Sequence, residues 1–460
     1  MTPWYERGKL ANPSRMRLKI AVLHFGFFYS GGGEKLVLEE VRGLRKLGHE
    51  VTCFAPFVDR HRCFPDYPEI RQVRRLLPHP PQWLPLNHAL WVLACCLLIP
   101  IMAPRFAGFD ILVGANQPAP WFAFVLSRLL RKPYVIYLAQ PLRLLHPRRI
   151  DQENGLRIRD GDQDFVRLVT KYAGPLIGWA DRLSVQCADA VLTNGRHVDE
   201  WIKEVYGVSS IVCAAGCHPA SMEALALKSP QTGQLRIGSS LISKPFILLS
   251  NRHSPMKRFE YALWALKQIL REMDTVSLVV TGQETEYTAQ LMYLTRTLRI
   301  EHRVEFVGLV SEDDLRLLYS EASLYVYTSP EEDFGMGIIE AMACGAPVVA
   351  WNVGGPTVSV AHGDTGFLVR PYDVDELAQR MLSVLRDPQL MHVMGIRGHA
   401  RAAEYFSYEW HNRQIEQVLL HSLSNVRSRM TVQLNSPVQE PVYARELIHP
   451  KSEDQRTRTG

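Results

Sequence analysis

Two glutamates, Glu332 and Glu340, have the types and spacing that could bind a charged ligand. Seven residues separate them, including Gly335 and Gly337. We expect Glu332 in a loop and Glu340 in the helix that follows, so both carboxylates can face the same end of a sheet. Glycines at a helix N-terminus let backbone N–H groups approach an anion, and the helix dipole favours negative charge there. The structural alternative is a capped core helix in which Glu340 pairs with an arginine, because a carboxylate in an apolar helix needs a partner.

Two cations, Arg252 and Lys257, precede this stretch and lie on either side of Ser254-Pro255. An arginine at a strand end and a lysine where a helix begins can converge on one phosphate, the arginine as a fork and the lysine as a point charge. Two solvated surface cations are the alternative. The presence of Glu332 and Glu340 in the same half of the chain favours a binding site.

Apolar runs around these residues predict the strands of a parallel sheet. Leu324–Tyr327, an apolar helix over 338–343 and Pro347–Ala350 indicate a strand, a buried helix and a second strand. The same half of the chain contains three more runs with the character of buried strands, at 246–250, 276–280 and 304–307.

The first half of the chain also predicts alternating strands and helices. Leu18–Leu23 and Val51–Phe54 flank a helix with apolar residues at helical spacing, and strands follow at 110–113 and 134–137. This start is similar to a dinucleotide-binding fold, so an oxidoreductase is one alternative. The run Gly31–Gly33 is not G-x-G-x-x-G, however, and no acidic residue ends the second strand.

The stretch from Glu332 to Glu340, with the run Glu340–Val349 after it, resembles the E-x7-E signature of retaining GT-B glycosyltransferases of family 4. The resemblance covers residues 17 to 420. It implies an α/β fold of two Rossmann-like parallel-sheet domains that face each other across a cleft. It also implies that Glu340 holds the ribose of a nucleotide sugar, whereas Glu332 and the backbone of Phe334, Gly335, Met336, Gly337 and Ile338 hold the sugar ring.

Further roles follow from the same resemblance. Arg252 and Lys257 would bind the donor diphosphate. The loop that contains Gly32 and Gly33 is similar to the family's GG-x-E loop and would approach the same diphosphate. A plain flexible turn is the alternative for that loop. Acceptor-side roles are implied for Glu34, Gln140 and Arg143. Ala139 stands where many relatives have a histidine close to the reacting sugar, which bears on acceptor chemistry more than on donor binding.

The reaction that the resemblance implies is transfer of a sugar from a nucleotide diphosphate to a hydroxyl, with retention at the anomeric carbon. Arg252, Lys257 and the helix N-terminus would stabilise the departing diphosphate without a metal or a cofactor. Asn251-Arg252, the Gly354–Pro356 turn and the 362–368 run look most like the mannosyltransferases of lipid-linked oligosaccharide assembly, which favours mannose from a GDP- or UDP-sugar. The rival is a catalytically impaired donor-binding partner subunit, suggested by Ala139 and Val358.

Composition is that of a globular chain with two domains. The 460 residues are 47% hydrophobic and 22% charged, with a formal net charge of +5. No basic stripe with interleaved aromatics indicates a nucleic-acid partner. The eight cysteines contain no C-x2-C pair and fit reduced thiols. Asp160–Asp164 is similar to a metal loop but lacks the residues of a calcium site, so we expect a solvated loop.

A segment rich in arginine, tryptophan and leucine over 56–106 has two readings. One is a packed helical excursion, and the other is an interfacial patch on a membrane that carries a lipid-linked acceptor. The patch residues are Trp83, Leu84, Trp91, Leu93, Leu97 and Ile99. Without a signal peptide or a span of about 20 apolar residues, we expect a cytoplasmic protein, peripheral on the cytoplasmic membrane face.

The domain boundaries predicted from the sequence come in chain order. They are an N-terminal extension over 1–16, an acceptor-side domain over 17–220, a nucleotide-sugar-binding domain over 221–405, a helix crossing back over 406–423 and a disordered tail over 424–460. Residues 220–244 are polar and small, and they indicate a linker.

Overall fold

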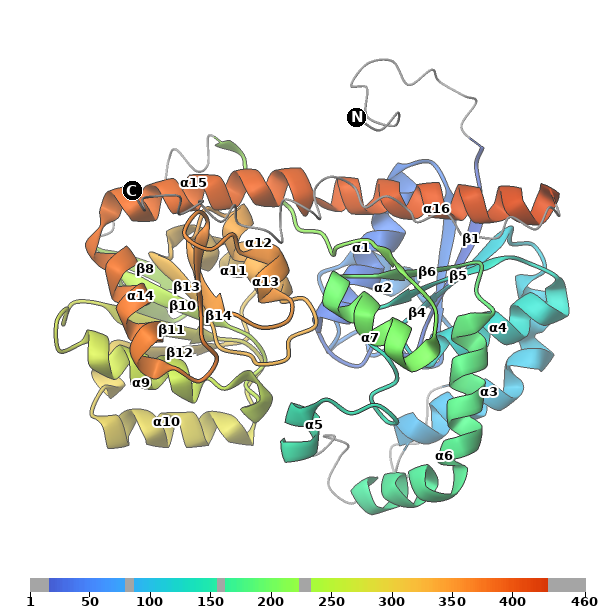
Figure 1. Cartoon of the computed structure of the whole chain (residues 1–460), viewed down its shortest axis with the longest axis horizontal. Helices are drawn as coiled ribbons and strands as arrows, with labels where there is room; N and C mark the ends of the chain where they lie inside the picture. Colours follow the sequence, from blue (N-terminus) through green and yellow to red (C-terminus); the bar gives the residue numbers. More distant parts are fainter. Residues whose placement is uncertain (1–15, 79–86, 155–161, 223–232, 429–460) are drawn as a thin grey trace, which may run out of the picture. The chain divides into compact units, whose positions relative to one another are not determined.

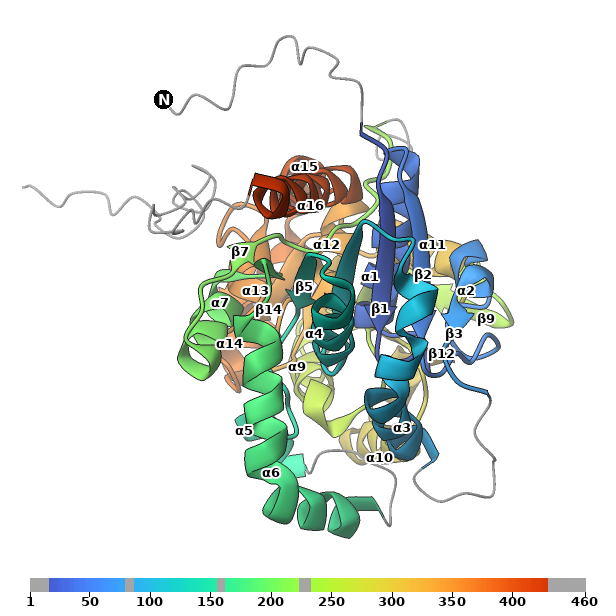
Figure 2. The same ribbon diagram turned by 90° about the vertical axis from the view of Figure 1, so that its right-hand side faces the viewer.

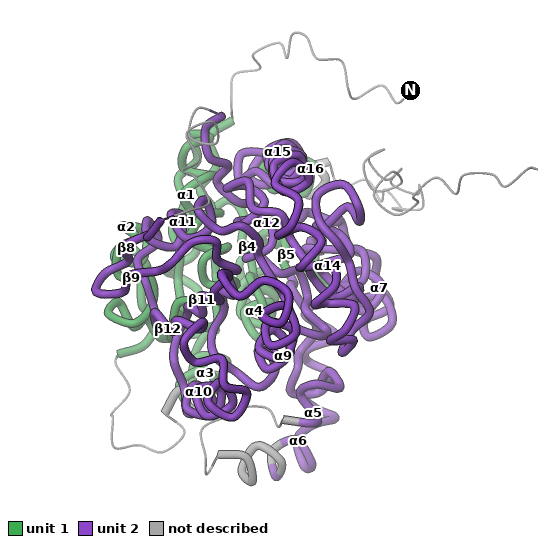
Figure 3. Tube along the Cα trace, turned by 90° about the vertical axis from the view of Figure 1, so that its left-hand side faces the viewer, with its two compact units in different colours: residues 1–137, 187–190, 415–427 green, residues 138–186, 191–414, 428–460 purple. Residues whose placement is uncertain are grey.

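The computed structural model describes residues 16–78, 87–154, 162–222 and 233–428 (Figure 1). The chain divides into two compact units, coloured separately in Figure 3. Unit 1 comprises residues 1–137, 187–190 and 415–427, and unit 2 comprises residues 138–186, 191–414 and 428–460. The domain boundaries given above remain a prediction. The N-terminal extension and the tail predicted over 424–460 lie almost wholly outside the described residues, except that the last helix runs on to Ser428, where a disordered tail was expected.

The first sheet has the order β3-β2-β1-β4-β5-β6-β7, and the pairs whose register is resolved are parallel. Its strands are β1 (Lys19–His24), β2 (Glu50–Ala55), β3 (Arg74–Arg75), β4 (Ile111–Ala115), β5 (Tyr134–Leu138), β6 (Ala190–Thr193) and β7 (Ile211–Val212). Its central strands are buried on both faces, as continuous apolar runs in a parallel sheet should be.

The second sheet lies in unit 2 and is also parallel, with the order β12-β11-β10-β13-β14-β15. Its strands are β10 (Phe246–Ser250), β11 (Ser277–Thr281), β12 (Val304–Gly308), β13 (Leu324–Tyr327), β14 (Val348–Trp351) and β15 (Gly366–Val369). The order reverses between β10 and β13, and ligands bind at such switch points of open α/β sheets. The prediction of an α/β fold with two parallel Rossmann-like sheets is confirmed.

Helices connect these strands and cover the sheets. The helices within residues 1–137 of unit 1 are α1 (Gly32–Lys46), α2 (Pro68–Gln72), α3 (Asn87–Met102), η1 (Ala103–Phe106) and α4 (Ala119–Leu130). Those that follow in the chain are α5 (Arg149–Asn154), α6 (Asp162–Gln186), α7 (Arg196–Tyr206), η2 (Pro255–Lys257), α9 (Glu260–Ile269), α10 (Glu286–Leu298), η3 (Glu301–Arg303), α11 (Glu312–Glu321), α12 (Met336–Ala343), α13 (Pro356–Ser359), α14 (Val374–Arg386), α15 (Pro388–Tyr405) and α16 (Tyr408–Ser428).

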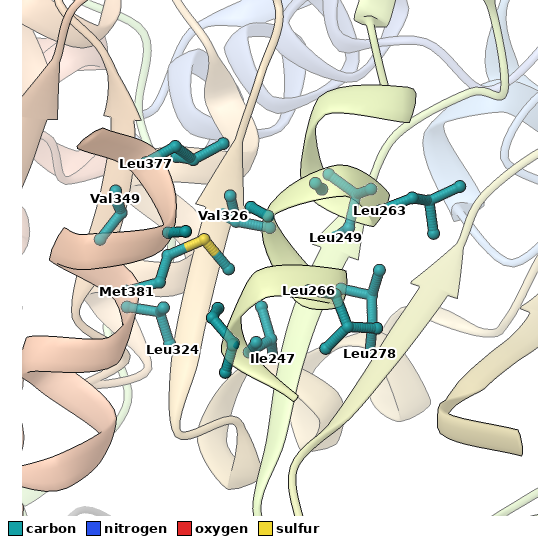
Figure 4. Close-up of a cluster of buried hydrophobic side chains, with 14 of the residues drawn as sticks. Ile247, Leu249, Leu263, Leu266, Leu278, Leu324, Val326, Val349, Leu377 and Met381 are labelled. Carbon is teal, nitrogen blue, oxygen red and sulfur yellow. The ribbon is translucent and has the colours of Figure 1, made fainter. Parts of the chain in front are cut away.

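The core of unit 2 fixes the strands that carry the candidate site. Side chains of β10 and β13 meet those of α9 and α14 in one apolar cluster (Figure 4). Ile247, Leu249, Val326, Leu266 and Met381 are almost completely buried in it. The cluster therefore holds the ends of β10 and β13 in place, and the loops that follow these strands contain the predicted donor-binding residues.

The linker prediction for 220–244 is wrong for its second half. Strands β8 (Gln234–Ile237) and β9 (Ser240–Ser243) form an antiparallel hairpin there. Ile237 and Ile242 are buried, and Gly238 in the turn has a φ of +54°. A two-residue turn that begins with glycine between short runs is a hairpin signal, and the polar composition of the segment concealed it.

The segment over 56–106 forms α2, β3, α3 and η1, and only part of the residues predicted for the patch is exposed. Cys95 and Ile99 of α3 are buried, so Ile99 belongs to the core and not to a surface patch. Leu93 and Leu97 are exposed on the same helix, whereas Trp83 and Leu84 lie outside the described residues. Among the residues that the structure describes, no helix combines the length and apolar character needed to cross a bilayer.

Candidate active site

The loop between β13 and α12 carries the E-x7-E glutamates, as the sequence predicts. β13 ends at Tyr327, and α12 begins at Met336 with Gly335 as its N-cap. Gly335 has a φ of +84°, a left-handed conformation that favours glycine. The helix N-terminus thus follows a sharp turn, and its first N–H groups face the end of the sheet where anions are favoured.

Lys257 and Glu332 form an ion pair in this loop. Lys257 Nζ donates to Glu332 Oε2 at 2.6 Å, and the hydroxyl of Ser329 donates to the same oxygen at 2.9 Å. The two charged side chains are only 23% and 17% exposed. Burial by itself would raise the pKa of Glu332, but the charge and hydrogen bond of Lys257, with Arg148, outweigh it and lower this pKa to about 2. Glu332 is therefore ionised at neutral pH.

The glycine turn after β14 supports the backbone of the same loop. Gly355 N–H donates to the carbonyl oxygen of Glu332 at 2.8 Å. A Cβ atom at Gly354 would lie 2.5 Å from that oxygen, and one at Gly355 would lie 2.3 Å from Phe334 Cα. Only glycine fits at these two positions, which gives the Gly354–Pro356 motif a steric reason that does not depend on the ligand.

Glu340 lies on α12 above a cluster of buried hydroxyl groups. Tyr319 O–H donates to Glu340 Oε2 at 3.3 Å, and Ser250 Oγ is hydrogen-bonded to the hydroxyls of Tyr319 and Tyr325 at 2.8 and 3.1 Å. Gly337 makes room for this cluster, because a Cβ atom there would lie 2.5 Å from the Tyr325 oxygen. The hydroxyl of Tyr319 is thus one hydrogen-bond partner of the Glu340 carboxylate.

Arg252 and Lys257 follow β10, as predicted. Arg252 is exposed, and its backbone N–H donates to Asn251 Oδ1 at 2.9 Å. A Cβ atom at Gly282 would lie 1.9 Å from the Asn251 carbonyl oxygen, so this glycine allows the close approach of β11 to the turn. Lys257 closes the turn η2, where its N–H donates to Ser254 O at 2.8 Å.

The predicted sugar-binding backbone is anchored by its own side chains. Phe334 is 3% exposed and its ring packs against Phe406 at 6.0 Å between centroids. Ile338 is completely buried, and Met336 is half-buried in the first turn of α12. These side chains point into the core, which leaves the backbone as the part of the segment suited to a ligand.

Arg148 is a residue that sequence reasoning missed. Its Nη1 atom donates to the carbonyl oxygen of Glu331 at 2.7 Å and lies 3.3 Å from Asp333 Oδ2. Its Nε atom donates to the buried Asp151 at 3.1 Å. Arg148 thus connects the segment after β5 to Glu331 and Asp333, the residues on either side of Glu332. The separation of 185 positions between Arg148 and Asp333 leaves no local sequence signal.

The residues predicted for the acceptor side have diverse environments. Arg143 is paired with the buried Asp151, to which its Nε atom donates at 3.0 Å, and it shares this carboxylate with Arg148. Gln140 Oε1 is buried and has no hydrogen-bond partner within the described part of the chain. An unsatisfied buried oxygen is uncommon, and at a strand end it suits a ligand or a water.

The remaining predicted residues belong to unit 1. Gly32 and Gly33 form the first turn of α1, and Glu34 is 4% exposed. The carboxylate of Glu34 folds back toward its helix N-terminus, since a Cβ atom at Gly31 would lie 2.5 Å from Glu34 Oε2. Gly33 faces Asn116, whose Nδ2 would be 3.5 Å from an added Cβ. Glu34 is thus a buried acidic residue in the first turn of α1.

No cluster of three His, Cys, Asp or Glu side chains suited to a metal ion occurs within the described ranges. The loop Asp160–Asp164 begins outside those ranges, and the side chains of its remainder are not described either. The absence of a metal requirement stays a prediction.

Two families match this chain in adjacent parts. Residues 30–213 match Glycosyltransferase Family 4, and residues 238–401 match Glycosyl transferases group 1. The first match covers the region of the GG-x-E loop and of Arg143. The second covers Arg252, Lys257 and the E-x7-E stretch, so both halves of the predicted site fall within a matched range.

Individual relatives and solved structures agree with these family matches. The chain is 28% identical to alpha-1,3/1,6-mannosyltransferase ALG2 of Homo sapiens over 404 residues, which are 84% of this chain and 92% of the relative. Anabaena HepE, solved in complex with UDP, superposes with a TM-score of 0.67 at 20% identity, over 88% of this chain and 100% of HepE. Sucrose-phosphate synthase from Thermosynechococcus elongatus also has a TM-score of 0.67 at 20% identity, over 88% and 99% of the two chains. These two structures share the fold.

Proposed function

We propose, from the premise that this chain belongs to the family-4 glycosyltransferases of the GT-B fold, that it transfers mannose from a nucleotide diphosphate sugar to a hydroxyl group. The acceptor is a glycan or a lipid-linked glycan, and the anomeric configuration is retained. The similarity to a relative named as an alpha-1,3/1,6-mannosyltransferase over most of both chains supports mannose. The UDP in the similar HepE structure supports a nucleotide-sugar donor, in which the sugar is attached to GDP or UDP.

The observation that carries the proposal is the Lys257–Glu332 ion pair at 2.6 Å. It joins the two predicted motifs of the donor site. A donor diphosphate brings negative charge that attracts Lys257, and a sugar hydroxyl brings a donor for Glu332. Exchange of the internal pair for these two contacts couples recognition of the phosphate to recognition of the sugar.

The proposed reaction balances with the residues of the chain and the two substrates. The bond from the anomeric carbon to the phosphate oxygen breaks, and the bond to the acceptor oxygen forms on the same face. The acceptor proton passes to the departing phosphate. Arg252, Lys257 and the N-terminus of α12 stabilise the charge that develops on that phosphate, as preorganised donors do at other sites of charge development. No metal ion or cofactor takes part in this scheme.

The second candidate is a donor-binding partner subunit with impaired catalysis. Ala139 and Val358 favour it, because relatives commonly have a histidine and a glutamate at these places. Such a subunit keeps the Lys257–Glu332 pair and the Glu340 site. It binds the nucleotide sugar but does not turn it over.

We further propose that the protein works as a peripheral protein on the cytoplasmic face of a membrane. Leu93, Leu97 and Ile101 recur every four residues on α3 and are 54%, 70% and 76% exposed. The exposed Arg74 and Arg75 follow α2 in the same unit. Exposed apolar side chains and exposed cations in the same unit suit the surface of an anionic bilayer, where a lipid-linked acceptor would be found.

One experiment separates the two candidate functions. The purified full chain is screened by thermal shift against GDP-mannose, UDP-glucose and other nucleotide sugars, and turnover is then followed with soluble and lipid-linked acceptors. Product formation with and without a chelator, and the anomeric configuration by NMR, test metal independence and retention. Tight donor binding without transfer or hydrolysis would support the impaired subunit.

A further inference from the structure

Helix α6 has an unusual distribution of side chains. Its inner face, which packs on other parts of unit 2, contains small and polar residues, among them Gly174, Gly178, Asp181 and Ser184, together with the buried Val185. A Cβ atom at Gly178 would lie 3.4 Å from Leu145 Cδ1, so small residues allow the helix to approach the segment after β5. A helix of a globular protein normally directs its large apolar residues to this inner face.

The outer face of α6 contains the large apolar residues instead. Leu168, Tyr172, Leu176 and Trp179 are 54%, 73%, 67% and 61% exposed. Their positions recur every three or four residues, which places them on one side of a helix. Scattered exposed apolar residues are ordinary on protein surfaces, but a contiguous row of this kind marks an interaction site. Figure 2 shows α6 as a long helix.

Charge identifies the kind of partner. Lys171 and Arg182 are exposed beside the apolar row, and Lys171 Nζ lies 5.5 Å from the centre of the Tyr172 ring. Between Leu168 and Gln186 the sequence has one acidic residue, Asp181, and it is 6% exposed. Tyr206 O–H donates to Asp181 at 2.8 Å on the inner side. The outer face therefore presents cations without anions.

We propose that the outer face of α6, formed by Leu168, Lys171, Tyr172, Leu176, Trp179 and Arg182, docks on the surface of a bilayer that contains anionic lipids. Leucine side chains enter the boundary between head groups and acyl chains. Tyrosine and tryptophan are suited to that boundary because each has an apolar ring and a polar group. The cations contact the lipid phosphates.

This surface differs from α3 and does not depend on the proposed reaction, because an inactive chain would still present it. The competing occupant is a second copy of the chain. A row of cations on each copy would meet the same charge in a symmetric contact. Like charges in a contact of that kind disfavour it, whereas an anionic lipid surface complements them.

The test uses the full chain in flotation with vesicles of phosphatidylcholine, with and without phosphatidylserine. Leu176→Ser/Trp179→Ser should weaken binding to the mixed vesicles by roughly tenfold or more, since it removes two apolar anchors. Lys171→Glu/Arg182→Glu should abolish the preference for phosphatidylserine. Trp179→Phe, which keeps an aromatic ring, should bind nearly as the parent does. The matched control is Tyr293→Ser, because Tyr293 is 72% exposed on α10 and should leave binding unchanged.

Two further readouts make the outcome decisive. Turnover with a soluble acceptor should stay at the parent rate in the Leu176→Ser/Trp179→Ser variant, so failure of the surface and failure of the proposed catalysis are distinguishable. Equal vesicle binding by parent and double variant would refute the proposal. A parent that is dimeric in light scattering and becomes monomeric in the double variant would assign the face to a second copy.

Discussion

Lys257 Nζ and Glu332 Oε2 lie 2.6 Å apart, so the predicted phosphate ligand and the predicted sugar ligand neutralise each other before any donor is bound. The pair is about four-fifths buried at both side chains. Glu332 therefore keeps its charge because of Lys257, and loss of Lys257 changes the protonation and the binding properties of Glu332. Most of the predictions below follow from this coupling.

Lys257→Ala should reduce turnover by about 100- to 1000-fold, the typical effect of removing one preorganised donor from a site of developing charge. Folding should be affected much less, because Glu332 keeps its hydrogen bond from Ser329 and can take up a proton. Steady-state rates and thermal unfolding of the purified variant measure the two effects. Turnover near the parent rate would remove Lys257 from the proposed mechanism.

The double variant Lys257→Ala/Glu332→Gln is a control for this experiment. It leaves no unpaired carboxylate, so its stability should return toward that of the parent. Its turnover should stay low, because neither side chain can contact the donor as proposed. A variant that recovers both properties would indicate that the pair is purely structural.

The stability of the protein should depend on the ionisation of Glu332. Folding lowers the pKa of this carboxyl from 4.5 to about 2, so the stabilisation is complete above pH 4.5 and is lost as the pH falls toward 2. The contribution at neutral pH is on the order of 1 to 3 kcal/mol. Urea unfolding of the parent and of Glu332→Gln across this pH range isolates the effect as a difference. A difference that does not change between pH 4.5 and pH 2 would contradict it.

The two glutamates should be separable by their ligands. Glu332→Ala should keep its affinity for the free nucleotide and lose affinity for the nucleotide sugar, because Glu332 is assigned to the sugar. Glu340→Ala should weaken both by roughly ten- to a hundredfold, the effect of losing a hydrogen bond to a charged group. Titration calorimetry with GDP and GDP-mannose distinguishes them. Equal losses for the two ligands in Glu332→Ala would reverse the assignment.

The succession of strands along the chain and the positions of the two motifs could be predicted from the sequence, because apolar runs and glycines report local geometry. Leu324–Tyr327 and Val348–Trp351 are strands, and Gly335 begins the helix that follows the first of them. The hairpin at 234–243 was missed because its strands are short and partly polar. Ile99 was assigned to a surface patch because α3 is apolar all round, and only packing shows which face is inside.

The contacts between the residues of the site could not be predicted from the sequence. The R-x4-K and E-x7-E motifs suggest a common ligand, but the direct contact between Lys257 and Glu332 depends on the ends of two strands that are neighbours only in the folded sheet. The same holds for Arg148, whose partners Glu331 and Asp333 lie far along the chain. Such contacts arise from the sheet order and have no periodicity to reveal them.

Arg148→Ala should lower kcat by roughly tenfold to a hundredfold, because it frees the loop on both sides of Glu332 and small displacements of positioned groups are costly. Loss of Arg148 should also raise the pKa of Asp333 further. Burial already raises this pKa, and the charge of Arg148 opposes that rise. The control is Arg149→Ala, since Arg149 is exposed and adjacent. An unchanged kcat in Arg148→Ala would show that the loop holds its shape without this contact.

Part of the binding of α3 to membranes should persist at high salt concentration. Trp91 is a poor choice for testing it, because its Nε1 atom donates to Pro78 O at 2.6 Å and the side chain is half-buried. Leu97 and Ile101 are 70% and 76% exposed, so their replacement by serine should not disturb folding. The exposed cations Arg74 and Arg75 should add an attraction to anionic lipid of about 1 kcal/mol each, which salt screens.

The parent should therefore bind anionic vesicles less tightly as salt rises, without complete release. Leu97→Ser/Ile101→Ser should lose the share of the high-salt binding that α3 contributes, whereas Arg74→Glu/Arg75→Glu should lose mainly the part that salt removes. Leu309→Ser, at an exposed leucine of unit 2 that is 67% accessible, is the matched control and should bind as the parent does. A double serine variant with unchanged binding at every salt concentration would show that α3 does not contact the bilayer.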